Sequence, residues 1–257
     1  SYSCSSLRHA TSMIGGREKI YDIDLNSPNM RPDVGKKGDV VIFPQMYGLP
    51  TEIKKKAGVN LIEDACQSLG SKVKDIYSGL QGDIGVFSFY ATKLMTTSGQ
   101  GGMFVSKDKN LVDKVRDYRE FDCRRDKKHR FNFQMTDLQA SIGRVQLKQL
   151  PIFLERRQEI FAMYKETGLD LIESENKASV HYRAVIRVNN PAEVKDKLLK
   201  QSIKTIIPIE DWELLDDGSK YRNSYNLTQT TLSLPIYPSL TNEDVLNIVI
   251  ELNKVIN

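Results

Sequence analysis

The residues best suited to chemistry lie close together in the sequence, between residues 61 and 102. Asp64 ends an apolar run, Ser88 lies between two phenylalanines, and Lys93 follows shortly afterwards. The glycine-rich turn at residues 99–102 then allows the backbone to approach a ligand closely. A carboxylate, a hydroxyl, an amine and a glycine turn in one short segment suit the binding of a cofactor that carries a phosphate.

Each of these residues also has an ordinary structural interpretation. Asp64 could pair with a cation of a ligand at the carboxyl end of a strand, or it could cap the N-terminus of a helix. Ser88 could bond to a phosphate oxygen or to a backbone carbonyl. Lys93 could be a surface lysine, or a desolvated amine that forms a Schiff base. The glycine turn alone is a weak signal, because it is not a GxGxxG motif.

Other kinds of catalytic site find little support. The sequence has three histidines, and none of them lies in a GxSxG or HExxH motif. No cluster of residues has the spacing of metal ligands. The three cysteines are odd in number and too widely spaced for a CxxC pair or a disulfide framework. Free thiols of this kind favour a reducing, cytoplasmic environment.

Composition and charge exclude further classes of protein. The 257 residues, 40% hydrophobic and 27% charged, are typical of a globular protein with one large domain or two smaller ones. The sequence predicts no membrane span and no secretory signal. The net charge of +4 is too mild for a typical nucleic-acid binder, but it suits an anionic small ligand. The densest basic run, at residues 124–130, is either a solvated loop or a contact for such a ligand.

The elements that must position these residues alternate between strands and helices. Short apolar runs predict strands that are buried on both faces, at residues 19–23, 40–43, 60–63, 86–89 and 102–105. Helix-compatible segments lie between some of them. This alternation favours an α/β fold, with a mostly parallel sheet flanked by helices.

Two helices begin at capping boxes. Thr136 and Gln139 mark a long helix in which Pro151 could cause a kink, and Thr241 and Asp244 mark the last helix. Between these helices the pattern predicts strands at 182–188, 204–207 and 231–234, and a helix at 192–201. The sequence therefore predicts a large domain over residues 1–158 and a smaller C-terminal α/β domain over residues 159–257.

Taken together, the motifs resemble those of the DegT/DnrJ/StrS family of pyridoxal phosphate (PLP) sugar aminotransferases. The similar segments, in order, are EDACQS, GDIGVFSFYATK, GQGGMFV, RFNFQMTDLQASIGRVQLKQL and LSLPIYPSLT. Their order and spacing are those of the family, and the resemblance runs from Ser1 to the last helix. It implies the fold type I architecture of PLP-dependent transferases, with a PLP-binding large domain that lacks its usual N-terminal part.

The resemblance implies a role for each residue that matches a family motif. Lys93 would form the Schiff base with the cofactor aldehyde and later move the proton between the substrate carbon and the cofactor. Asp64 would pair with the pyridinium nitrogen, which keeps the ring an electron sink. Gln67 would lie near the ring and its 3-hydroxyl group. Ser88 would hydrogen-bond the phosphate.

Two further residues have positions that match the family. Cys4 stands where many relatives place an aromatic ring against the cofactor. Asn132 would reach the phosphate held by a neighbouring subunit, so the resemblance implies a homodimer with shared active sites. Trp212, the only tryptophan, could stack on a sugar or a base, but the sequence favours a core position for it.

The implied reaction is transfer of an amino group, usually from glutamate, to a keto sugar carried on a nucleotide diphosphate. Such a reaction would serve the synthesis of amino sugars and surface polysaccharides. A histidine replaces the lysine in a relative that carries out a dehydration, so Lys93 favours transamination. The resemblance also implies a phosphate-binding turn in a segment before Ser1. The alternative is a truncated, non-catalytic family member that acts as a structural or binding partner.

Overall fold

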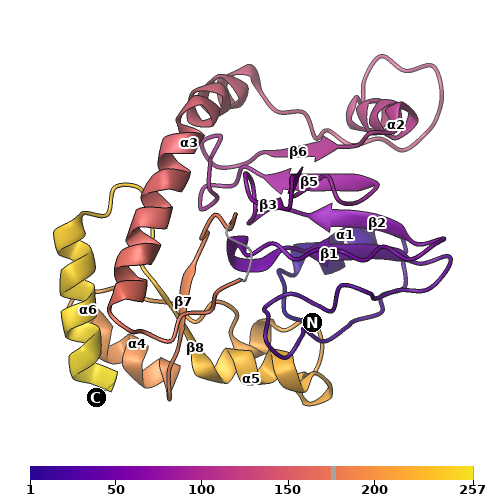
Figure 1. Ribbon diagram of the computed structural model, residues 1–257. Helices are drawn as coiled ribbons and strands as arrows, with labels where there is room; N and C mark the ends of the chain where they lie inside the picture. Colours follow the sequence, from indigo (N-terminus) through magenta and orange to yellow (C-terminus); the bar gives the residue numbers. More distant parts are fainter. Residues whose placement is uncertain (175–177, 257) are drawn as a thin grey trace.

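The computed structural model describes residues 1–174 and 178–256, and its architecture is α/β (Figure 1). The central sheet has the strand order β1-β2-β5-β6. Its strands are β1 (Val40–Pro44), β2 (Asn60–Asp64), β5 (Ile84–Ser88) and β6 (Gly102–Val105). The first three are parallel, and β6 pairs with β5 in the antiparallel direction. The prediction of a mostly parallel sheet is confirmed.

The two faces of the sheet are covered unequally. Val41, Phe43 and Leu61 are buried on one face, where they form a hydrophobic cluster. Ile42 and Ile62 point to the other face and line a cavity of about 560 Å³ beside helix α1 (Ser6–Met13). The expectation that these strands are buried on both faces was wrong, because α1 covers this second face only in part.

The segment before β1 differs from the prediction. The expected strand at residues 19–23 was wrong, since only one bridge, between Ile23 and Met30, is formed there. The Asp22 carboxylate instead accepts hydrogen bonds from the backbone amides of Asn223 (3.0 Å) and Ser224 (2.9 Å). These bonds hold the segment against the start of helix α5 (Arg222–Thr230) and away from the sheet.

The connections between the parallel strands contain no α-helix. A short 3-10 turn, η1 (Met46–Gly48), follows β1. A small hairpin of β3 (Lys72–Val73) and β4 (Ile76–Tyr77) lies between β2 and β5. The expected alternation of helices with these strands was therefore wrong in this part of the chain. Helix α2 (Lys109–Arg119) comes only after β6.

Helix α3 (Asp137–Glu166) links the sheet to the rest of the molecule. Thr136 and Gln139 form the predicted capping box, and the helix continues through Pro151. Figure 1 shows α3 running from the β6 side of the sheet down beside helix α6 (Asn242–Ile256). The predicted cap of α6 is also confirmed, because Thr241 and Asp244 bond to each other reciprocally.

The C-terminal part packs around a two-stranded antiparallel sheet of β7 (Ala184–Arg187) and β8 (Thr231–Leu234). Helices α4 (Pro191–Lys200) and α6 and the end of α3 cover this sheet, and their buried side chains form one hydrophobic cluster. The predicted strand at 204–207 was wrong, because it is reduced to one bridge between Ile206 and Ser233. Pro208 cannot donate to a longer ladder.

Two short 3-10 turns, η2 (Asp211–Glu213) and η3 (Gly218–Lys220), precede α5. Trp212 lies on η2 and is 78% exposed, so the prediction of a core position for this residue was wrong. Its neighbours Asp211 and Glu213 are charged and keep η2 at the surface. Among the described residues, no helix is long and apolar enough to cross a membrane.

Candidate active site

The ends of two neighbouring parallel strands bring Asp64 and Ser88 to the same edge of the sheet. Asp64 is the last residue of β2 and lies opposite Val86 of β5. Ser88 is the last residue of β5, two positions further on, so it lies on the same face as Val86. Both side chains are only partly buried. A ligand at this edge can therefore reach a carboxylate and a hydroxyl.

Asp64 does not cap a helix. Its Oδ1 atom accepts a hydrogen bond of 3.0 Å from the backbone amide of Cys66, within a turn. Gln67 follows in the same turn, and its Oε1 atom accepts a hydrogen bond of 2.8 Å from the amide of Tyr47. The turn is thereby tied to the residues after β1. The interpretation of Asp64 as a helix cap is therefore wrong, and its carboxylate lies at the carboxyl end of β2.

Lys93 is held by a compact turn after β5. Its amide donates to the carbonyl of Tyr90 at 3.0 Å, and the amide of Tyr90 donates to Ser88 Oγ at 3.3 Å. The next two residues, Leu94 and Met95, are buried and anchor the turn. The Lys93 side chain is half-buried, and its Nζ atom lies 5.3 Å from the centre of the Tyr182 ring. Lys93 is therefore partly shielded from solvent by the cleft that it lines.

Cys66 lies in the turn that follows Asp64. Burial raises the pKa of the Cys66 thiol, and the negative charge of Asp64 raises it further. The thiol therefore stays protonated at neutral pH.

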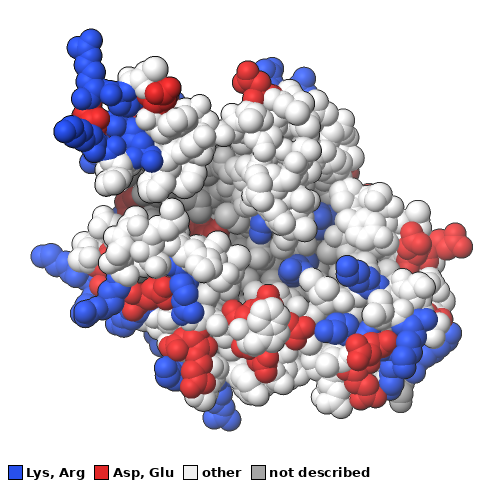
Figure 2. Space-filling view, turned by 180° about the vertical axis from the view of Figure 1, so that it is seen from behind, with Lys and Arg blue, Asp and Glu red and all other residues white. Residues whose placement is uncertain are grey.

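Asn132 lies apart from this group. It is exposed on the segment between α2 and α3, where Phe131 and Phe133 stack at 4.8 Å. Within the described part of the chain, no hydrogen bond joins Asn132 to the other predicted site residues. The basic run before it is an exposed loop, as one of the two interpretations predicts. Arg124 pairs with Glu120, and Arg130 pairs with Asp117 and Asp126. Figure 2 shows basic side chains gathered on this projecting part of the molecule.

A cleft of about 1090 Å³ opens beside Lys93 and extends to the C-terminal part of the chain. Four of its lining residues were not singled out from the sequence: Arg157, Tyr182, Arg183 and Lys204. Arg157 is only 7% exposed and donates to the carbonyls of His181, Tyr182 and Ile236. Sequence reasoning missed these residues because they come from α3 and from two separate segments around β7 and β8, and no motif joins them.

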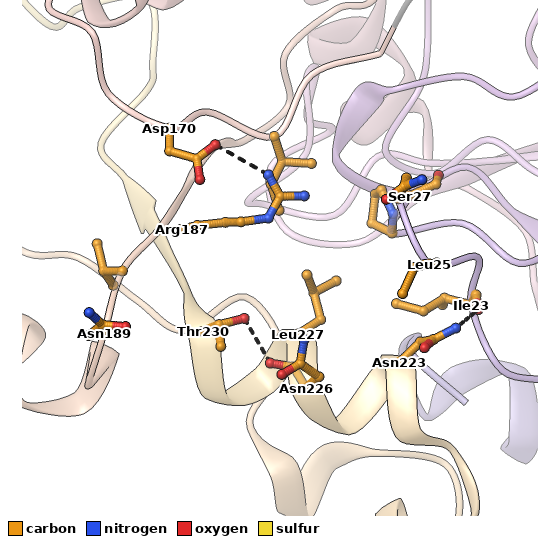
Figure 3. Close-up of a pocket in the computed structure, with 14 residues that line it drawn as sticks. Ile23, Leu25, Ser27, Asp170, Arg187, Asn189, Asn223, Asn226, Leu227 and Thr230 are labelled. Atoms are coloured by element: carbon orange, nitrogen blue, oxygen red, sulfur yellow. Dashed lines mark hydrogen bonds and ion pairs between the residues drawn. The ribbon is translucent and has the colours of Figure 1, made fainter.

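A third cavity, of about 380 Å³, lies between residues 23–28, β7 and α5 (Figure 3). It contains none of the predicted site residues. Its one basic side chain, Arg187, is paired with Asp170 at 3.3 Å, and Figure 3 shows the two reaching toward each other. The cleft beside Lys93 is therefore the candidate active site.

A family model of the DegT/DnrJ/EryC1/StrS aminotransferase family matches residues 20–253. The chain belongs to this family. Its members are PLP-dependent sugar aminotransferases. The family assignment that the motifs suggest is therefore confirmed, together with its cofactor.

Several named relatives of this family resemble the chain over most of its length. GDP-perosamine synthase of Escherichia coli O157:H7 is 29% identical, over 90% of this chain and 69% of the relative. The UDP-N-acetyl-3-dehydro-alpha-D-glucosamine 3-aminotransferase of Acidithiobacillus ferrooxidans is 28% identical, over 93% of this chain and 72% of the relative. A family member from Brucella abortus with a crystal structure has a TM-score of 0.89 at 22% identity, over 100% of this chain and 78% of that chain. This last likeness confirms the fold.

The chemistry of the gathered side chains fits PLP. Lys93 supplies a half-buried amine, the kind of group that condenses with an aldehyde. Asp64 supplies a carboxylate that can pair with a protonated ring nitrogen. Ser88 supplies a hydroxyl at the same strand edge that can bond to a phosphate. The described residues contain no group of three or more potential metal ligands.

His181, below the cleft, should make the stability of this aminotransferase fall in acid. Its ring stacks on Phe161 at 3.8 Å, and burial lowers the pKa of His181 to about 4. An unfolded histidine has a pKa of about 6.5, so the folded state favours the neutral ring. The stabilisation is complete above pH ~6.5 and is lost as the pH falls toward ~4, by about 2 kcal/mol at pH ~4.5.

Urea unfolding at neutral pH and at pH ~4.5 measures this loss. The matched variant is His181→Asn, because asparagine tolerates the left-handed backbone conformation of residue 181, where φ is 46°. This variant should show a smaller loss of stability in acid than the unmodified protein. Equal losses in both proteins would exclude His181 as the cause.

Proposed function

We propose that this chain transfers an amino group from an amino acid, such as glutamate, to a keto sugar carried on a nucleotide. The observation that carries the proposal is the position of Lys93, which lines a cleft of about 1090 Å³ on the turn after Ser88, while Asp64 ends the neighbouring strand. The names of its relatives support a nucleotide-linked substrate, since they include GDP-, UDP- and dTDP-linked sugars. One relative is a spore coat polysaccharide biosynthesis protein, which supports a role in polysaccharide synthesis.

Each of the predicted site residues would have its own role in such a reaction. When bound, PLP would supply an electron sink for the bonds of the carbon that carries nitrogen. Lys93 would hold the cofactor through its amine, and the same amine would move a proton to and from the reacting carbon. Asp64 would hold the proton of the ring nitrogen, and Ser88 would bind the phosphate. Gln67 and Cys4 would border the ring.

We also propose that two copies of the chain form the working enzyme. The first turns of α3 expose apolar side chains, with Leu138 72% and Val145 60% exposed. Phe133, beside Asn132, is 65% exposed. Exposed apolar groups concentrated in one region favour a protein contact. A second copy at this face would bring Asn132 to the phosphate in its partner's site.

The chain divides into two domains in this proposal, with the boundary at residue 158 inside α3. Before the boundary, Leu150 and Leu154 of α3 pack with Phe89 and Leu94 beside the sheet. After it, Ile160 and Tyr164 pack with the C-terminal cluster. The proposed compartment is the cytoplasm, where its three free cysteines would stay reduced.

Reduction with borohydride tests the proposal directly. Purified protein is incubated with PLP, its visible absorbance is recorded, and it is then reduced and digested for peptide mapping. We expect a yellow absorbance band and a reduced PLP adduct on Lys93. A protein that shows no band and an unmodified Lys93 would instead match the alternative, a non-catalytic member of the family.

A further inference from the structure

None of the four basic residues that line the cleft has an ion-pair partner among the residues that the structure describes. Two of them are Arg183, which is half-buried, and Lys204, which is exposed. Among the described residues, Asp244 is the only acidic one that lines the cleft, and its carboxylate is bonded to Thr241 at the start of α6. The cleft therefore presents positive charge that the described residues do not neutralise.

The other two basic residues of the cleft already have partners or a role. Lys93 lines the part of the cleft where the cofactor is expected. Arg157 donates to three backbone carbonyls, at 3.3, 3.2 and 2.9 Å, and is nearly buried. The remaining two cations, Arg183 and Lys204, are the more accessible ones for an anionic ligand in the cleft.

The strand register places these two cations in one row. Ala184 of β7 lies opposite Leu234 of β8, and Ser233 of β8 forms a bridge with Ile206 on its other side. Continuing both antiparallel registers puts Arg183 and Lys204 on either side of the residue that follows Leu234. Residues in one row point to the same face, and strands are about 4.8 Å apart. The Cα atoms of the two cations are thus about 10 Å apart, with both side chains on the cleft face.

The ring of Tyr182 lies close to both Arg183 and Lys93. The Arg183 guanidinium carbon lies 5.4 Å from the centre of the Tyr182 ring, and Lys93 Nζ lies 5.3 Å from the same point. Each distance is within the range of a cation–π contact. The ring therefore restrains Arg183 near the amine of Lys93.

We infer that Arg183 and Lys204 bind the diphosphate of the nucleotide-linked sugar, and that Tyr182 is a positioning residue for Arg183. The inference rests on the proposed function and names the residues that select its substrate. An arginine fork binds phosphate oxygens in pairs, and a lysine adds a mobile point charge. A diphosphate between these two side chains would direct its sugar toward Lys93 and its nucleoside toward solvent.

Titration calorimetry on the PLP-loaded protein tests the inference, with GDP, UDP and dTDP as probes. We expect at least one probe to bind, and both Arg183→Gln and Lys204→Gln to weaken that binding about tenfold each, because each removes one charged contact. Binding should also weaken as salt is added. Arg183→Lys should retain part of the affinity. Lys107→Gln is the matched control, because Lys107 is exposed and does not line the cleft, and this variant should bind normally.

Three results would overturn the inference. The first is that no nucleoside diphosphate binds the unmodified protein. The second is unchanged affinity in both glutamine variants, with thermal melting showing that they are folded. The third is that Arg183→Gln slows only the reaction with glutamate, since Arg183 would then bind the donor carboxylate. Each of these can occur while PLP still forms its adduct on Lys93, so failure here is distinct from failure of the proposed function.

Discussion

Replacing Lys93 with alanine is expected to lower kcat for transamination by about a thousandfold or more. The substitution removes the half-buried amine that lies 5.3 Å from the Tyr182 ring, and with it the group that moves the proton. Steady-state transamination with glutamate and a keto sugar nucleotide measures the effect. The residual activity of Lys93→Ala should rise when a small primary amine is added, because a free amine can take over part of the proton transfer.

The control for this experiment is a lysine that the structure leaves exposed. Lys107→Ala should keep the activity of the unmodified protein, since Lys107 is exposed before α2. Lys93→Arg keeps a positive charge but cannot attach to the cofactor, so it should be as inactive as Lys93→Ala. Equal activity in the Lys93 and Lys107 variants would refute the assignment of Lys93.

Replacing Arg157 with methionine should destabilise the fold by about 3 kcal/mol. Arg157 is 7% exposed, and its Nη1 atom donates to the carbonyls of His181, Tyr182 and Ile236. Methionine fills similar space but leaves these carbonyls without their donor. Burial lowers the pKa of Arg157 to about 10, so the guanidinium still carries its charge at neutral pH. Urea unfolding at pH ~7 measures the change.

A second arginine on the same helix provides the comparison. Arg156 is more exposed, and it bonds to Glu159 and to the carbonyl of Leu240. Arg156→Met should cost about 1 kcal/mol, because water can replace its bonds. Arg157→Lys should fall between these values, since lysine keeps the charge but has fewer donors. If Arg157→Met unfolds at the same urea concentration as the unmodified protein, the three carbonyl bonds contribute no net stability.

Strands and helix starts that depend on neighbouring residues in the sequence could be predicted. The strands at 40–43, 60–63 and 102–105 and both capping boxes lie where the sequence predicts them. The strand at 19–23 fails because the carboxylate of Asp22 bonds to amides some two hundred positions further along the chain. No local pattern reports such a contact. Trp212 is exposed because it lies on a charged turn, although its size alone favours burial.

The candidate site divides in the same way. Asp64, Ser88 and Lys93 could be singled out because they lie close together in the sequence. Asp64 and Ser88 end neighbouring strands, and Lys93 follows Ser88. Arg183 and Lys204 could not, because their common row depends on how β8 pairs on both of its sides. Pairing of this kind is a tertiary property. The burial of Arg157 likewise depends on three carbonyls supplied by two separate segments.

Helix α3 has a mechanical consequence for how substrates enter. Helix α3 has 30 residues and is therefore about 45 Å long. Its side chains belong to the cluster beside the sheet and to the C-terminal cluster, and no loop interrupts the helix between them. Swinging one half of the molecule against the other would require this stiff rod to bend. We therefore expect the cleft to keep a nearly constant width during turnover, so that sugar nucleotides exchange through a permanently open mouth. Small side-chain movements at the rim, at Lys204 for example, would then set the pace of exchange.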